Sequence, residues 1–187
     1  MSAYFHDFGL YNINIDYLRY LHTFDSEVQF DEDGHYERKP FVGVMIIIEG
    51  YHYFIPLSSR KSKHATWDNV GTAHYLVYEK VDVEKLRDKD VFKAINDKEV
   101  LKILAVLDIK KMIPVSEGLF SKINFKEVEP KHYRRLLQKE CEFCENIKDG
   151  ILKKANTIYE EQISTGVIHD YYCSFSLLED ACDNYLK

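Results

Sequence analysis

The chain of 187 residues contains few of the residues that interrupt or cross-link a polypeptide. It has four prolines, eight glycines, four cysteines and one tryptophan. Because the glycines and prolines are scattered and no repeat occurs, we expect one domain over residues 1–187. No run approaches the roughly 18 apolar residues of a membrane span, so no membrane partner is expected.

Secretion and metal signals are also missing. The N-terminus lacks the basic region and apolar stretch of a secretory signal, so the cysteines are expected to be reduced thiols in a cytoplasm. Cys141 and Cys144 could share a helix face, but their wide separation from Cys173 and Cys182 favours buried thiols over a zinc site. Without a Walker loop, Gly-x-Gly-x-x-Gly or His-Glu-x-x-His motif, we expect no cofactor and no metal.

The charge of the chain is unevenly distributed. The formal net charge of −6 argues weakly against binding to nucleic acid. However, residues 1–35 hold one arginine against seven acidic side chains, whereas residues 36–64 hold five basic side chains against two acidic ones. The local electrostatic potential attracts a charged ligand more strongly than the total charge of the protein does. This basic segment can therefore bind an anion.

Apolar periodicity predicts an α+β domain with a mostly antiparallel sheet. The apolar, β-branched runs 41–48 and 51–57 predict a hairpin with Glu49-Gly50 as its turn. The other expected elements are a helix at 17–24, strands at 73–81, 101–107 and 110–115, a short helix within 86–98, and helices starting at Pro130, 151 and 176, with a break at Gly150 and an end near Gly166.

Residues 58–64, Ser-Ser-Arg-Lys-Ser-Lys-His, directly follow the second strand of this hairpin. They combine three hydroxyls, three permanent cations and an imidazole. Such groups at the end of a rigid strand can bind a phosphate. By composition alone, a solvated loop is the more frequent explanation of a Lys/Arg cluster.

Cleavage of RNA by its own 2′-hydroxyl is one reaction that these groups could support without a metal. The substrate supplies the nucleophile, so the protein must align it, stabilise charge on the phosphoryl oxygens and move two protons. Cations and hydroxyls can stabilise the charge, and Lys61 or His64 could move protons.

Several other segments accompany this loop. They are Lys-Pro-Phe-Val-Gly-Val at 39–44, Phe-Ile-Pro-Leu-Ser-Ser-Arg-Lys at 54–61, Lys-Met-Ile-Pro-Val at 111–115, Tyr-Arg-Arg-Leu-Leu at 133–137 and Cys-Ser-Phe-Ser-Leu-Leu-Glu at 173–179. In this order and spacing the chain resembles the ToxN/AbiQ family, the protein toxins of type III toxin–antitoxin systems. The resemblance runs from about residue 17 to the C-terminus, and Pro-Leu-Ser-Ser-x-Lys is its most specific element.

The resemblance implies a sequence-specific, metal-independent endoribonuclease with a barrel core like that of the MazF/Kid toxins and helices near both termini. It implies cleavage of single-stranded cellular or phage RNA, leaving a 2′,3′-cyclic phosphate. A small structured RNA antitoxin would be processed by the toxin, inhibit it and join it in an RNA-bridged hetero-oligomer. The implied role is abortive infection of phage in the bacterial cytoplasm.

The same resemblance implies which residues form the site. Ser58, Ser59 and Lys61 match its hydroxyl, hydroxyl and lysine positions, and Lys39 matches a basic position implicated in cleavage. On physical grounds, Ser59 would donate to a phosphoryl oxygen or the 2′-oxygen, Lys61 would stabilise charge or donate a proton, and Ser58 would fix the loop or contact the phosphate. The expected RNA contacts are Tyr36, Arg38, Arg60, Lys63 and His64, with Lys131, Arg134 and Arg135 on the long helix. A surface histidine without a task is an equal alternative for His64, and a solvated face is an equal alternative for the helix.

Two other functions remain open from the sequence. One is a non-catalytic RNA-binding module that uses the same basic loop. The other is a protein-interaction domain with no role for RNA. The retained hydroxyls and lysine favour the enzyme.

Overall fold

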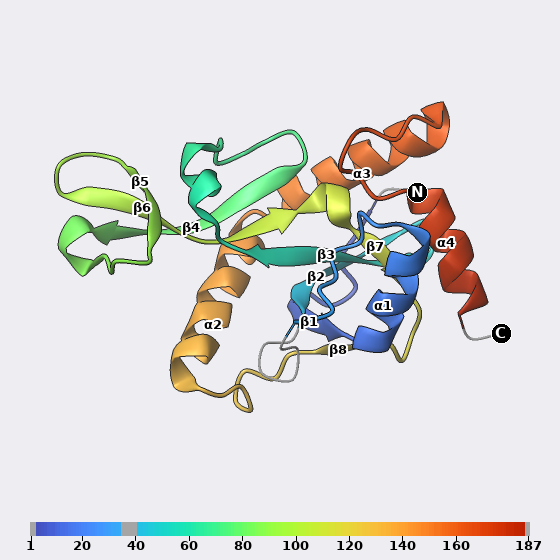
Figure 1. Ribbon diagram of the computed structural model, residues 1–187, viewed down its shortest axis with the longest axis horizontal. Helices are drawn as coiled ribbons and strands as arrows, with labels where there is room; N and C mark the ends of the chain where they lie inside the picture. Colours follow the sequence, from blue (N-terminus) through green and yellow to red (C-terminus); the bar gives the residue numbers. More distant parts are fainter. Residues whose placement is uncertain (1–2, 35–40, 186–187) are drawn as a thin grey trace.

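The computed structural model describes residues 3–34 and 41–185 (Figure 1). Its centre is an antiparallel sheet of eight strands in the order β4-β6-β3-β2-β1-β8, with β5 paired to β6 and β7 paired to β3. The strands are β1 Leu10–Ile13, β2 Val42–Ile48, β3 Tyr51–Ser59, β4 His74–Asp82, β5 Val91–Ala94, β6 Glu99–Asp108, β7 Ile113–Val115 and β8 Phe120–Lys122.

The hairpin of β2 and β3 confirms the most distinctive structural prediction. The two strands pair over six residue pairs. Glu49 and Gly50 both have positive φ angles, 49° and 87°, as in the two-residue turns whose twist matches antiparallel strands. A Cβ at Gly43 would lie 2.2 Å from the carbonyl oxygen of Ile55, so this close approach of β2 to β3 requires glycine.

Strand β3 connects two parts of the sheet. Its early residues pair with β7, whereas its last three residues, Leu57, Ser58 and Ser59, pair with β6. From this point β4, β5 and β6 extend away from the rest of the molecule as an arm (Figure 1). The basic loop therefore begins where the arm leaves the body of the sheet.

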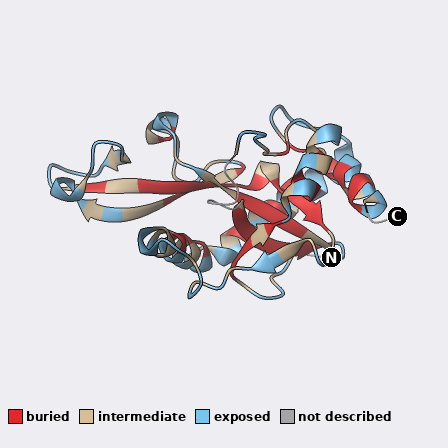
Figure 2. Cartoon of the chain, turned by 60° about the horizontal axis from the view of Figure 1, so that its bottom comes forward, coloured by how far each residue is buried: buried red, intermediate tan, exposed pale blue. Residues whose placement is uncertain are grey.

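The described residues form four α-helices beside the sheet: α1 Ile15–Phe24, α2 Lys131–Asn146, α3 Lys148–Thr165 and α4 Phe175–Asn184. Helix α4 packs against α1 and β7, and α2 packs against β4 and β6. Buried residues gather in the strands and on one side of the helices (Figure 2), as expected when apolar burial drives folding. No helix in the described part of the chain is long and apolar enough to cross a membrane.

The α+β class, the mostly antiparallel sheet and the helical ends are as predicted, but the barrel core that the resemblance implies does not close. Within the described residues, the path of paired strands ends at β4 and β8, and these two do not pair. The sheet is therefore open.

The predicted helix within 86–98 is also wrong, because β5 occupies this stretch and pairs with β6. The Asn96 side chain accepts hydrogen bonds from the N–H groups of Lys98 and Glu99. Asparagine favours turns of this kind, and this one reverses the chain between β5 and β6. Charged residues are tolerated here because much of β5 faces solvent.

Glycine has two different roles in the C-terminal helices. The break between α2 and α3 falls at Ile147, three residues before the predicted position. Gly150 lies inside α3, where a Cβ would meet the Tyr75 hydroxyl at 2.7 Å. Gly166, with φ 67°, ends α3 as predicted.

Candidate active site

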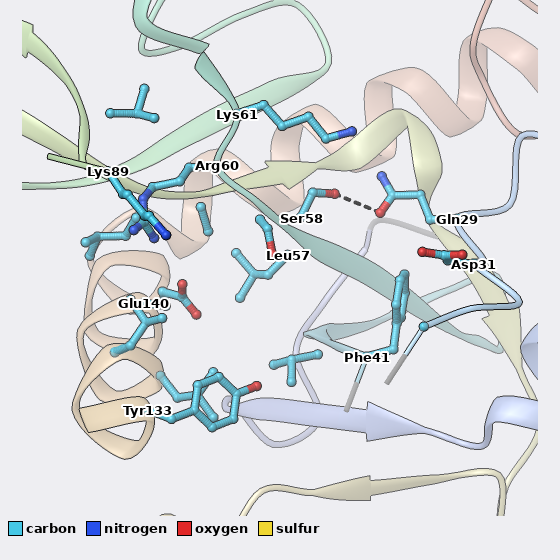
Figure 3. A pocket seen from close by; sticks show the side chains of 18 of the residues that line it. Gln29, Asp31, Phe41, Leu57, Ser58, Arg60, Lys61, Lys89, Tyr133 and Glu140 are labelled. Atoms are coloured by element: carbon cyan, nitrogen blue, oxygen red, sulfur yellow. Dashed lines mark hydrogen bonds between the residues drawn. The ribbon is translucent and has the colours of Figure 1, made fainter. Parts of the chain in front are cut away.

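A cavity of about 970 Å³ opens beside the end of β3 (Figure 3). Its walls come from the segment after α1, from the end of β3 with the following loop, and from α2. Ser58, Ser59, Arg60 and Lys61 all line it. The fold thus places the two hydroxyls and the lysine predicted to be catalytic at one cavity.

The two serines are held by the sheet. Ser58 pairs with Val106 and Ser59 pairs with Ala105 of β6, so both belong to the strand itself. Ser58 is half-buried, and its hydroxyl donates a hydrogen bond of 2.7 Å to the side-chain oxygen of Gln29 (Figure 3). Ser59 is exposed. Their backbone positions are fixed by strand pairing rather than by a free loop.

His64 supports the turn that presents Lys61. The backbone N–H of Lys61 donates to Nδ1 of His64 at 3.0 Å, and the N–H of His64 donates to the carbonyl oxygen of Lys61 at 2.9 Å. Burial, with help from Lys63, Lys61 and His74, lowers the pKa of His64 to about 4, so the ring is neutral near pH 7. His64 is only 4% exposed, while Lys61 is exposed.

Arg60 lines the cavity but is tied to an acidic partner. Its guanidinium lies 3.6 Å from Asp90 Oδ1, and Lys102 approaches the other carboxylate oxygen at 2.9 Å. Burial alone would raise the pKa of Asp90, but bonds from Lys102 and the Arg87 N–H, together with Arg60, lower it. The carboxylate therefore stays ionised and offsets part of the positive charge of Arg60.

Helix α2 presents one aromatic, two apolar and one acidic side chain to the cavity rather than its basic side. Tyr133 and Glu140 line the cavity together with two leucines of the same helix (Figure 3). The predicted RNA contacts Lys131, Arg134 and Arg135 lie outside the cavity lining. Arg134 instead donates to the carbonyl oxygen of Val128 at 3.0 Å and forms an ion pair with Glu129.

The remaining predicted contacts lie elsewhere. The Lys63 ammonium stands 5.2 Å from the centre of the Trp67 ring, a cation–π distance, and does not line the cavity. Tyr36, Arg38 and Lys39 lie outside the described residues, so their predicted roles stay predictions.

The four cysteines are free thiols. Cys144, Cys173 and Cys182 are buried and Cys141 is half-buried. Burial raises the pKa of Cys144 and of Cys173, which keeps both protonated and unreactive. In the described ranges, no group of three or more His, Cys, Asp and Glu side chains is arranged to hold a metal ion.

Comparison with known proteins places this arrangement in a family. The model of the family described as "Toxin ToxN, type III toxin-antitoxin system" matches residues 9–183. The chain belongs to the ToxN toxin family. The predicted resemblance is thereby confirmed, and it extends over nearly the whole chain.

Relatives with a described activity are similar over most of their length. The chain is 29% identical to "Endoribonuclease ToxN" of Pectobacterium atrosepticum over 178 residues, which are 95% of this chain and 93% of that protein. It is 25% identical to "Endoribonuclease AbiQ" of Lactococcus lactis subsp. lactis over 179 residues, 95% and 88% of the two chains. These relatives are endoribonucleases, in agreement with the predicted enzyme class.

A solved structure confirms the fold. It is described as "A processed non-coding RNA regulates a bacterial antiviral system", and its chain superposes with a TM-score of 0.72 at 25% identity. The match covers 96% of this chain and 99% of that chain. This ToxN-family chain therefore shares its α+β fold with a chain of that structure.

Gln29, Tyr133 and Glu140 are among the lining residues of the ToxN-family chain that were not predicted from the sequence. Gln29 lies in a polar loop segment that carries no motif, and Tyr133 and Glu140 lie on a helix that was predicted to contribute its basic side. The spacing of Tyr133, Leu136, Leu137 and Glu140, at three and four residues, already placed them on one helix face. That signal was readable, whereas the position of Gln29 depends on the fold.

Proposed function

We propose that this protein is a metal-independent endoribonuclease toxin that cleaves single-stranded RNA at specific sequences. The observation that carries the proposal is the placement of Ser58, Ser59 and Lys61 at one large cavity beside β3. The 2′-oxygen of the substrate forms a bond to phosphorus, and the bond from phosphorus to the 5′-oxygen breaks. The products are a 2′,3′-cyclic phosphate and a 5′-hydroxyl.

Each side chain has a task in this reaction. Ser59 donates to a phosphoryl oxygen, and Lys61 stabilises the negative charge that builds there and gives a proton to the leaving 5′-oxygen. A neighbouring base takes the proton of the 2′-hydroxyl. Lys39, as the family resemblance implies, assists cleavage.

The cavity also offers a place for the nucleotide itself. Its volume of about 970 Å³ is at the upper end of the range for ligand pockets. Tyr133 and Phe41 contribute aromatic rings to its lining, and an unpaired base can stack on such rings. Single-stranded RNA fits this site better than a duplex, because only unpaired bases can enter it.

The toxin is held inactive in the bacterial cytoplasm by a small structured RNA that it also processes, within an RNA-bridged hetero-oligomer that acts in phage defence. Support comes from the related structure described as regulated by a processed non-coding RNA in an antiviral system. Lys131 and Arg135 are exposed on α2, which borders the cavity, and they supply phosphate contacts to this RNA.

The test is incubation of the purified protein with RNA in EDTA. We expect cleavage at defined sites, with 2′,3′-cyclic phosphate ends identified by their resistance to phosphatase until acid treatment. RNA that is bound but intact at high protein concentration would instead identify a non-catalytic RNA-binding module. The absence of salt-sensitive RNA binding would identify a protein-interaction domain.

A further inference from the structure

A chain of hydrogen bonds leads from Ser58 to a buried carboxylate. Ser58 Oγ donates to Gln29 Oε1 at 2.7 Å, and Gln29 Nε2 donates to Asp108 Oδ2 at 3.4 Å. Asp108 ends β6, far from both partners in the sequence, and is 8% exposed. Its other oxygen, Oδ1, makes no hydrogen bond with any described residue and lies 3.8 Å from the Lys110 ammonium.

The direction of each hydrogen bond in this chain follows from the contact between Gln29 and Asp108. Oδ2 of Asp108 accepts a hydrogen bond from the NH₂ end of the Gln29 amide. The amide oxygen is thereby turned toward Ser58, and the Ser58 hydroxyl must donate. Because a serine hydroxyl has one hydrogen, Ser58 can only accept a hydrogen bond from a molecule in the cavity.

Asp108 lies among several cations. Burial raises the pKa of Asp108 overall, and four nearby side chains offset part of this rise. They are, in order of effect, Lys110, Lys111, His74 and Lys63. Lys110 and Lys111 lie in the turn that follows β6. His74 belongs to β4, and Lys63 lies in the loop after β3.

The segment that carries Gln29 is fixed on its N-terminal side. Val28 is buried, and its carbonyl oxygen lies 2.8 Å from the His22 ring. Asp25 accepts a hydrogen bond of 2.7 Å from the Ser174 N–H, and Glu27 forms an ion pair with Lys111. Gln29 is therefore held against Ser58 by contacts with α1, α4 and the turn after β6.

We propose that Gln29 and Asp108 are positioning residues that hold Ser58 as a hydrogen-bond acceptor for the 2′-hydroxyl of the bound substrate. This contact orients the 2′-oxygen before the reaction, and the proton of the hydroxyl then passes to the neighbouring base as the 2′-oxygen attacks. Ser59 and Lys61 are then the donors to the phosphoryl group. This inference rests on the proposed ribonuclease function and divides the tasks of the two adjacent serines. It also gives the site a contact that only ribose can make, because deoxyribose lacks the donating 2′-hydroxyl.

The test exchanges the amide of Gln29 and the carboxylate of Asp108 between the two positions. Gln29→Glu alone brings two carboxylates together, and Asp108→Asn alone leaves the Gln29 amide free to bind in either orientation. In the double variant, the amide at position 108 donates to the carboxylate at position 29, which still accepts from Ser58. We expect each single variant to lower kcat about tenfold with KM changed less than about threefold, and the double variant to return kcat to within about threefold of wild type.

Glu179→Gln is the matched control, because Glu179 is a partly buried carboxylate away from the cavity. It accepts hydrogen bonds of 2.8 and 2.9 Å from the hydroxyls of Tyr53 and Tyr159. We expect this variant to lower the melting temperature and leave kcat unchanged. Gln29→Met removes the polar contacts without adding charge, and it replaces Gln29→Glu if that variant fails to fold.

The outcomes separate this inference from the proposed function. If wild-type protein cleaves RNA and the single variants keep kcat within about twofold, the positioning role is wrong. It is also wrong if the double variant is no faster than the slower single variant. If wild-type protein cleaves no RNA, the proposed function itself fails.

Discussion

Two basic clusters, the loop after β3 and the outer face of α2, have similar composition and different surroundings. In the loop, Lys61 reaches a large cavity next to two serines that are part of a strand. On α2, Lys131 and Arg135 face solvent and Arg134 pairs with Glu129. Positive charge alone therefore does not distinguish the proposed reaction centre from the other basic cluster. The loop differs by its fixed hydroxyls and its cavity.

The loop itself repeats this contrast on a smaller scale. Arg60 is held by Asp90, and Lys63 lies over Trp67, whereas Lys61 is presented to the cavity by a turn that His64 closes. Cations that look equivalent in the sequence thus have three different environments. We expect these differences in environment to produce differences in function.

The largest expected effect is that of Lys61→Ala or Ser59→Ala. Each change removes a group that stabilises charge on the phosphoryl oxygens, so kcat should fall about 100- to 1000-fold while the melting temperature changes little. Single-turnover cleavage of a labelled RNA measures the rate. Lys153→Ala, an exposed lysine of α3, is the control and should cleave like wild type. Full activity of either site variant would contradict the assignment.

The basic face of α2 should behave differently from the loop. Lys131→Ala with Arg135→Ala should leave the rate on a bound short RNA unchanged but weaken the RNA antitoxin complex about tenfold. The plot of log affinity against log salt should become less steep by about 1.5. Titrations at several salt concentrations measure both. An equal effect from Lys126→Ala with Lys153→Ala would show that α2 has no special role.

His64 should make stability depend on pH. Its folded pKa of about 4 lies below the usual value of 6.5, so the unfolded chain binds more protons between these values. The stabilisation is therefore complete above pH 6.5 and is lost as the pH falls toward 4. Melting curves from pH 4.5 to 7.5 should show this slope, and it should be shallower in His64→Gln. A slope that is identical in both proteins would exclude His64 as its source.

The smallest expected effect is that of Lys63→Ala. The change removes a cation–π contact at an exposed site, worth about 0.5–1 kcal/mol, and one charge outside the cavity. The free energy of unfolding should fall by about that amount, and the cleavage rate by less than about threefold. Urea unfolding and the cleavage assay measure these quantities. If Lys63→Ala lowered the cleavage rate as much as Lys61→Ala, the two lysines would not differ in function as proposed.

The parts of the fold that the sequence predicts are those with a long regular pattern. The β2–β3 hairpin and α2 have clear periods of apolar residues and recognisable ends. Strands β1 and β8 have only four and three residues, too few to show a period. The charges around β5 concealed it as a strand, and they are tolerated because its alternate residues, Phe92 and Ala94, are exposed.

The residues of the candidate site also differ in how far the sequence predicts them. Ser58, Ser59 and Lys61 lie within four consecutive residues, so the sequence alone predicts their cluster. Gln29 and Asp108 are 79 residues apart and meet only when β6 pairs with β3 beneath the segment after α1. No local pattern contains that information.

The pairing of Ser58 and Ser59 with β6 has a consequence for inhibition. Residues within a hydrogen-bonded strand are already ordered before any RNA arrives, so a ligand loses no free energy in arranging them. The same rigidity means that an antitoxin cannot silence the enzyme by pulling these serines out of line without breaking the sheet. We therefore expect inhibition by occupation of the cavity, with every inhibitor competing directly against substrate.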